Sequence, residues 1–204
     1  MKRIILLFSL CLSLSLSAQH FRGGFQGGVL HSRLVAGYEK NWSTGFLFGG
    51  NVSYGNFKME INYIQKGGGS QVYNSTSGWF DYFKVGANYI QVPLSFHFTS
   101  EDDEDEGTRY DFELGIAPGR LLNSFSTVNY NNFANTLVFK KVTVDAFTNV
   151  GLNFGDNMFI GMRFSWSLFS DVERNPIPKG FFIPYFKNGH SITHQLILRF
   201  AFGG

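Results

Sequence analysis

The densest group of side chains capable of chemistry is a run of six carboxylates at residues 101–106, Glu-Asp-Asp-Glu-Asp-Glu. Clustered carboxylates suit a hard cation such as Ca²⁺, which prefers oxygen ligands. The run lacks the spacing of an EF-hand loop, because Gly107 follows all six acids instead of interrupting them. We therefore interpret it as a solvated periplasmic turn, with a calcium site as the alternative, and assign no metal ligands.

Histidine and serine are the other candidates for catalysis. The histidines are His20, His31, His97, His190 and His194, and no pair has the spacing of a zinc motif. His194 and Ser191 are the one loose candidate for hydrolysis of lipid at a membrane rim. Side chains three residues apart on a strand point to opposite faces, and no acid lies nearby in sequence to complete a triad. We predict no catalytic residue and no enzyme, with a lipid-modifying enzyme acting at the rim as the alternative.

Cofactor and nucleic-acid binding have no support in the sequence. The glycine clusters at 23–24, 27–28 and 67–69 do not precede helices, so they do not suggest a phosphate cradle. Without Lys2 and Arg3, the 17 basic residues become 15, equal to the 15 acidic ones. Nucleic-acid binding needs a concentrated basic face. We predict no cofactor and no nucleic-acid partner.

The first residues predict export. Lys2 and Arg3 precede an apolar segment at 4–16 that only serines interrupt, and Ser17 and Ala18 are small. This is the pattern of a cleaved secretory signal peptide, which we place at residues 1–19; a membrane-anchoring helix, which needs about 20 apolar residues, is the alternative. The only cysteine, Cys11, lies within this segment, so the mature domain at 20–204 has no disulfide and no thiolate ligand.

The mature chain alternates between apolar and polar residues in one segment after another, which predicts an all-β domain. The alternation predicts eight antiparallel strands near 21–31, 43–54, 57–66, 82–98, 109–119, 142–154, 158–168 and 192–202. The phase of the fourth strand shifts near Tyr89–Ile90, which suggests a β-bulge there. Two closed architectures fit eight such strands: a soluble lipocalin-like barrel and a transmembrane barrel.

Three features favour the transmembrane β-barrel of the bacterial outer membrane. The polar face is rich in Gly, Ser, Ala and Asn, which suits a narrow interior. Aromatic residues gather on the apolar face beside the short turns: Phe21, Tyr54, Phe57, Phe98, Tyr110, Phe154 and Phe202. Two-residue turns at 55–56 and 155–156 alternate with long segments at 67–81, 120–141 and 170–190, as periplasmic turns alternate with external loops.

This topology predicts a set of charged residues inside the barrel, because a charge facing lipid at mid-depth is costly. The residues in the polar phase are Arg22, Lys58, Glu60, Arg109, Asp111, Glu113, Asp145, Arg163 and Arg199. We expect Arg163 and Arg199 to pair with Glu60, Glu113 or Asp145. Trp42, Trp79 and Trp166 are expected to anchor the outer interface.

Three blocks of residues resemble one family. Residues 61–68 end in Tyr-Ile-Gln-Lys-Gly-Gly, residues 88–94 read Asn-Tyr-Ile-Gln-Val-Pro-Leu, and residues 114–119 read Leu-Gly-Ile-Ala-Pro-Gly. Asp145, Gly151, Arg163 and Leu168 are similar to the family's last strands. Together the blocks resemble the PorT-type outer-membrane β-barrel family of Bacteroidetes, although Gln91 stands where that family often has Glu. The resemblance implies an outer-membrane barrel, with a link to protein secretion as in the family's named member.

We therefore predict a non-enzymatic outer-membrane barrel that is structural or that binds and scaffolds partners through its external loops. The expected partners are outer-membrane lipid and lipopolysaccharide, and proteins at the loops. Aromatic residues near the first long loop, Tyr73, Trp79, Phe80 and Tyr82, are a possible ligand surface. A diffusion pore is disfavoured, since eight strands leave little lumen.

Overall fold

The computed structural model describes residues 21–35, 41–74, 79–100, 108–128, 131–132, 138–155, 157–173 and 190–202. The expected signal peptide at 1–19 and the acidic run at 101–106 lie outside the described residues. So do most of the expected external loop at 170–190 and the last two glycines.

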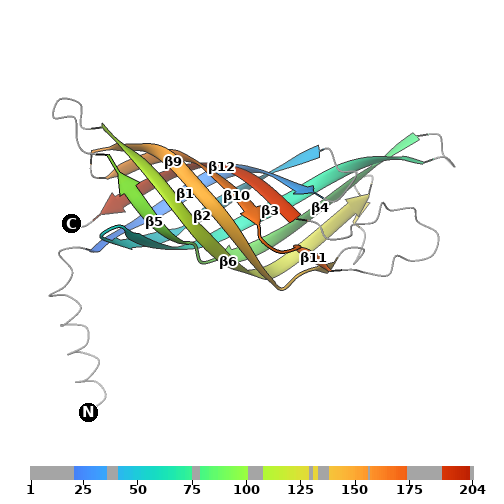
Figure 1. Ribbon diagram of the computed structural model, residues 1–204. Coiled ribbons are helices and arrows are strands. Elements are labelled where there is room, and N and C mark those ends of the chain that lie inside the picture. Colours follow the sequence, from blue (N-terminus) through green and yellow to red (C-terminus); the bar gives the residue numbers. More distant parts are fainter. Residues whose placement is uncertain are drawn as a thin grey trace, which may run out of the picture.

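The strands form one closed antiparallel barrel (Figure 1). Its long strands are β1 (Phe21–Val35), β2 (Asn41–Tyr54), β3 (Phe57–Asn74), β4 (Trp79–Gln91), β5 (Leu94–Thr99), β6 (Thr108–Val128), β9 (Val142–Phe154), β10 (Met158–Ser167) and β12 (His190–Phe202). Short strands are β7 (Asn131–Asn132), β8 (Val138–Phe139) and β11 (Val172–Glu173). β4 and β5 follow each other in one position, between β3 and β6. The pairing of β1 with β12 closes the ring, so eight strand positions make the barrel, as predicted.

The apolar face of the long strands points outward, except in β4, where Val85, Ala87 and Tyr89 face the lumen. In β10 and β12, buried and exposed residues alternate strictly over ten residues. Phe25 is 68% exposed and Ile61 56%, whereas Glu60 and Glu113 are at most 1% exposed. This is the reverse of a lipocalin, and it is the arrangement in which lipid can cover the outside. Among the described residues, no helix is long and apolar enough to cross a bilayer.

A girdle of aromatic side chains surrounds the end of the barrel with the short turns, as expected. Phe21, Tyr54, Phe57, Phe98, Tyr110, Phe154 and Phe202 are all 40% or more exposed. The turns themselves depend on Gly55 and Gly155, whose φ angles are 54° and 59°. Glycine adopts this left-handed conformation without the penalty that a Cβ atom brings, which is why the chain turns there. Tyr54 pairs with Phe57 across the predicted two-residue turn. Phe154 pairs with Met158, so the second connection has three residues, one more than predicted.

Two of the expected external loops are largely strand, and the sequence-based boundaries were wrong there. β3 and β4 remain paired from Gly69 opposite Lys84 to Asn74 opposite Trp79, within the expected loop at 67–81. β6 continues to Val128, within the expected loop at 120–141. Among the described residues, β2 pairs with β3 only as far as Gly69, opposite Asn41. The three strands therefore project beyond the barrel wall at this end, which we call the loop end (Figure 1).

The predicted irregularity near Tyr89 is confirmed in position, but the inserted residue lies on the neighbouring strand. The pairing of β4 with β6 shifts between Asn88 and Tyr89, and Leu122 of β6 is the unmatched residue. From Val85 to His97, the odd-numbered residues of β4 and β5 face inward, including Tyr89, which is 1% exposed. The apparent change of phase in the sequence arose because this inward position holds an aromatic ring.

An apolar layer fills the lumen toward the loop end. Phe139 of β8 is 5% exposed and packs with a cluster of buried residues: Leu30, Leu47, Ile64, Val85, Ala87, Tyr89 and Ile197. β8 pairs with β11, so the β6–β9 and β10–β12 connections together form the short ribbon that carries Phe139. The lumen is therefore obstructed at this level by packed side chains.

The closed barrel predicts resistance to detergent. Unfolding must break a continuous ring of backbone hydrogen bonds, so the mature protein in dodecyl sulfate should migrate at different positions in a gel before and after boiling. Fractionated cells should hold it in the outer membrane. Recovery of the protein from the periplasm without detergent, with one gel position under both conditions, would contradict the assignment.

Candidate functional site

A network of five charged side chains crosses the lumen on the side of the short turns. The members are Lys58 and Glu60 of β3, Glu113 of β6, Arg163 of β10 and Arg199 of β12, and all are at most 5% exposed. They come from strands around the barrel, and the inward phase of each strand makes them converge. We call this set the lumen ion network.

Its geometry is tightly specified. Both terminal nitrogens of Arg163 donate to the two oxygens of Glu60, at 2.9 and 2.7 Å. Arg199 donates to Glu113 at 2.9 Å and to Glu60 at 3.2 Å, while Lys58 donates to Glu113. Bidentate pairs of this kind are among the strongest hydrogen bonds in proteins. Each carboxylate thus faces more than one cation, which offsets the cost of burying it.

Neutral side chains complete the network. Gln26 donates to Glu60 at 2.7 Å and accepts a hydrogen bond from Arg199 at 3.2 Å. The guanidinium carbon of Arg163 lies 4.3 Å from the centroid of the Phe147 ring, and that of Arg199 lies 4.5 Å from the centroid of Phe159. Such cation–π contacts stabilise a desolvated guanidinium.

The glycine of β10 makes room for one of these rings. A Cβ atom on Gly161 would lie 2.3 Å from the ring of Phe159. The glycine therefore permits an aromatic ring to lie across the inner wall of the barrel.

A second polar cluster lies toward the loop end. Asp145 of β9 accepts hydrogen bonds from Lys66, from Gln91 at 2.8 Å and from Ser167 at 2.9 Å. Asp171, just beyond β10, lies 2.6 Å from the Ser167 hydroxyl. It also accepts from the backbone N–H of residue 191 at 3.1 Å, so this cluster ties the segment after β10 to the inner wall.

Most of the charges predicted to be inside the barrel are there. Lys58, Glu60, Asp111, Glu113, Asp145, Arg163 and Arg199 are all at most 5% exposed. Arg163 and Arg199 pair with Glu60 and Glu113, as expected. Arg22 and Arg109 line the opening at the short turns.

Two members of the loop-end cluster were missed from the sequence. Lys66 shares the phase of Lys58 and Glu60, so the alternation could have found it, but it lay at the end of the predicted strand. Asp171 fell in an expected loop, where no periodicity marks the direction of a side chain.

Ser191 and His194 do not form a site. Ser191 is 2% exposed and faces the lumen, with its hydroxyl 2.7 Å from that of Ser167. His194 faces outward, its ring centroid 4.8 Å from that of Trp42 and 5.2 Å from that of Phe164. Lys66 lies 3.4 Å from the Ser191 hydroxyl and pairs with Asp145.

The described residues contain no group of three or more His, Cys, Asp or Glu side chains that could hold a metal ion. The acidic run at 101–106, the alternative calcium site, lies outside them, so that interpretation stays a prediction.

The barrel with its apolar outer face and ion-paired lumen is that of an integral outer-membrane protein. Residues 15–171 match the family described as outer membrane protein beta-barrel domain. The chain belongs to this family, and the protein is located in the bacterial outer membrane. The family match does not extend to the PorT type or to a group of bacteria.

Solved outer-membrane barrels are similar to the chain at low identity. Neisserial surface protein A is 12% identical, with a TM-score of 0.49, and the alignment covers 90% of this chain and 97% of that one. Ail of Yersinia pestis, in complex with a heparin analogue, is 12% identical with a TM-score of 0.45, covering 90% and 99%. OprG of Pseudomonas aeruginosa is 9% identical with a TM-score of 0.42, covering 90% and 95%. No curated protein sequence matches the chain.

The lumen ion network makes a prediction about stability. Glu60→Ala leaves Arg163 with one weaker partner, and loss of one member of a buried ion pair costs about 3–5 kcal/mol. Urea unfolding in lipid vesicles should show a loss of this size. The double variant Glu60→Met with Arg163→Met should be much closer to the wild type, because it leaves no uncompensated charge. A Glu60→Ala protein as stable as the wild type would show that the network contributes little.

Proposed function

We propose that the protein is a non-enzymatic outer-membrane barrel that holds other proteins through the sheet projecting from its loop end. The observation that carries the proposal is the extension of β3 and β4 beyond Gly69, the last residue of β3 that pairs with β2 among the described residues. This extension, β3 residues 70–74 and β4 residues 79–83, with Val128 of β6 opposite Phe83, is called the projecting sheet below.

The projecting sheet offers backbone groups for pairing. In the part of the chain that the structure describes, residues 70–74 of β3 pair with β4 and have no strand on their other edge. A free edge presents a row of N–H and C=O groups, to which an extended segment of a partner can add as a further strand. An eight-stranded barrel closes without such an extension. Because the projecting sheet is not needed for closure, we assign it a role in binding.

The lumen supports a binding role over a transport or catalytic one. Its charged side chains are committed to each other, and Phe139 lies within an apolar layer across it. Among the described residues, the serine and histidine that could have formed a hydrolytic pair face opposite sides of the wall. The surface at the loop end is therefore the best candidate for function.

The link to protein secretion rests on the resemblance to the PorT-type family at residues 61–68, 88–94 and 114–119. A barrel that scaffolds a secretion machine needs a surface outside the lumen to which other proteins can bind. The projecting sheet offers such a surface, and the aromatic residues Tyr73, Trp79 and Phe80 lie on its strands.

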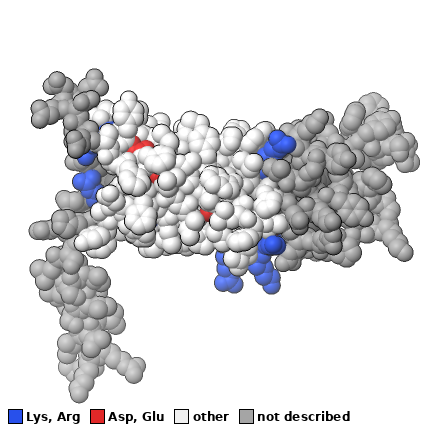
Figure 2. Space-filling view, in the orientation of Figure 1, with Lys and Arg blue, Asp and Glu red and all other residues white. Residues whose placement is uncertain are grey.

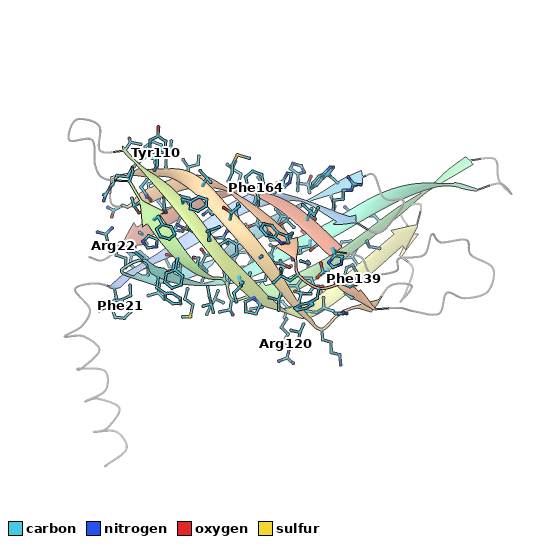
Figure 3. The ribbon with its side chains drawn as sticks, viewed as in Figure 1. Phe21, Arg22, Tyr110, Arg120, Phe139 and Phe164 are labelled. Carbon is cyan, nitrogen blue, oxygen red and sulfur yellow. The ribbon has the colours of Figure 1, made fainter. Side chains whose placement is uncertain are left out.

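Lipid is the second proposed partner. All five carboxylates whose side chains are described are buried: Glu60, Asp111, Glu113, Asp145 and Asp171. Arg120 and Lys141, by contrast, are exposed at the loop end, where Arg120 lies opposite Val142 and points away from the wall (Figure 3). Basic groups project from this end of the apolar belt in Figure 2. This placement suits the phosphate groups of lipid A in the outer leaflet.

The projecting sheet can be removed without opening the barrel. Gly69 and Lys84 are direct partners, so replacing residues 70–83 by Asn-Gly should close β3 and β4 with a two-residue turn. The shortened barrel should remain heat-modifiable but lose the proteins that cross-link to the wild type in intact cells. A deletion within 174–189 serves as the control. An unchanged set of cross-linked proteins would contradict the proposal.

The lipid contact makes a separate prediction. Each basic group near an anionic surface contributes about 1 kcal/mol, so the Arg120→Ala, Lys141→Ala double variant should bind lipid A several-fold more weakly. Native mass spectrometry of the protein in detergent measures this, with dephosphorylated lipid A as the comparison. Arg22→Ala, at the opposite end, should leave binding unchanged. Equal binding of the two lipids by the wild type would exclude phosphate recognition.

A further inference from the structure

The barrel opens at the end with the short turns into a cavity of about 520 Å³. Its wall includes side chains from strands on all sides, among them Arg22 of β1, Lys58 of β3, His97 of β5, Arg109 of β6 and Arg199 of β12. The volume falls in the range of small-molecule sites, about 300–1,000 Å³. Figure 3 shows Arg22 at this end of the barrel, away from Phe139.

The cavity has a floor. On the inner side of Lys58 and Arg199, Glu60 and Glu113 pair with these residues. The lumen ion network therefore blocks the lumen at the inner end of the cavity. The apolar layer around Phe139 lies toward the other end. A molecule in the cavity therefore enters and leaves by the short-turn end, which faces the periplasm in barrels of this class.

The charge of the lining favours an anion. Lys58 and Arg199 line the cavity but are paired with the carboxylates of the lumen ion network and, for Lys58, with Asp111. Counted together among the described residues, the lining and the network hold five basic side chains (Arg22, Lys58, Arg109, Arg163 and Arg199) and three carboxylates (Glu60, Asp111 and Glu113), which leaves an excess of positive charge. Arg22 and Arg109 each have an interaction of their own, and a guanidinium carries several N–H donors, so one partner does not exhaust it. Arginine is well suited to the paired oxygens of phosphate and carboxylate.

Two polar atoms of the lining indicate what else the ligand carries. Oδ1 of Asp111, a residue only 4% exposed, and Nδ1 of His97 have no hydrogen-bond partner among the described residues. Leaving a buried acceptor unsatisfied is costly, so Asp111 calls for a donor from the ligand. An ammonium group would be disfavoured by the excess of positive charge in the lining and the network, whereas a hydroxyl group donates without positive charge. A hydroxyl group also suits His97 in either tautomer.

We propose that this cavity is a periplasm-facing binding site for a small hydroxylated anion, a sugar phosphate or sugar acid. Arg22 and Arg109 bind the anionic group at the mouth. Asp111 accepts a hydrogen bond from a hydroxyl group deeper in the cavity, and His97 binds a second one. The site is separate from the projecting sheet, so its occupancy and the binding of protein partners can be tested independently.

The test is isothermal titration calorimetry of the full mature barrel in detergent, with glucose 6-phosphate as the probe and with glucose and inorganic phosphate for comparison. Glucose 6-phosphate should bind at least about tenfold more tightly than either, because only it engages both the arginines and Asp111. Arg22→Ala and Arg109→Ala should each weaken glucose 6-phosphate and phosphate alike, by about tenfold. Asp111→Ala should weaken glucose 6-phosphate alone.

Arg33→Ala is the matched control, since it removes the same kind of side chain from β1 near the loop end, where Arg33 lies opposite Ile192 and outside the cavity lining. Equal weakening by this variant, or no heat with glucose 6-phosphate, would overturn the proposal. A second measurement avoids dependence on the folding of Asp111→Ala. A thiol introduced by Ser53→Cys, on the cavity wall, should react more slowly with a maleimide when glucose 6-phosphate is present, and an unchanged rate would count against the site.

Discussion

The structure depends on the need of every backbone N–H and C=O group for a hydrogen-bond partner inside a hydrocarbon layer that offers none. A sheet meets this need only when its first and last strands pair. Here β1 and β12 pair over thirteen residue positions, from Gly23 opposite Phe202 to Val35 opposite His190. Closure has two consequences for the side chains. Those on the outer face must be apolar, because they contact lipid. The alternate side chains of each strand must point into the lumen.

Because the lumen is narrow, charged side chains that point into it are buried and need partners of opposite charge. Charged residues in the inward phase cannot reach bulk water at mid-depth, so they must neutralise one another across the barrel. Glu60 and Glu113 are shared among Lys58, Arg163 and Arg199, and these contacts join strands that are not neighbours in the wall. The lumen ion network thus connects opposite strands across the interior, while backbone hydrogen bonds connect neighbouring strands around the wall.

Outside the membrane, backbone groups can bond to water and the outer face need not be apolar. The two ends of the barrel differ in structure there. At the short turns the cavity remains open and polar, with basic side chains at its mouth. At the loop end Phe139 packs into the lumen, and β3, β4 and β6 continue outward as a projecting sheet. A barrel with one open and one obstructed end gives the two sides of the membrane different surfaces, which suits separate binding events better than passage through the lumen.

The sequence by itself determined the membrane-spanning part of the fold. Alternation placed the eight strands, gave the outward face to Phe57 and Tyr110, and assigned Glu60, Arg163 and Arg199 to the lumen, because lipid and lumen impose a period of two. It could not locate the ends of β3, β4 and β6, since outside the membrane neither face must be apolar. Only the tertiary structure decided that Lys66 meets Asp145, that Asp171 folds inward and that Phe139 obstructs the lumen. These contacts join distant segments, and their partners depend on register and closure, which no local pattern encodes.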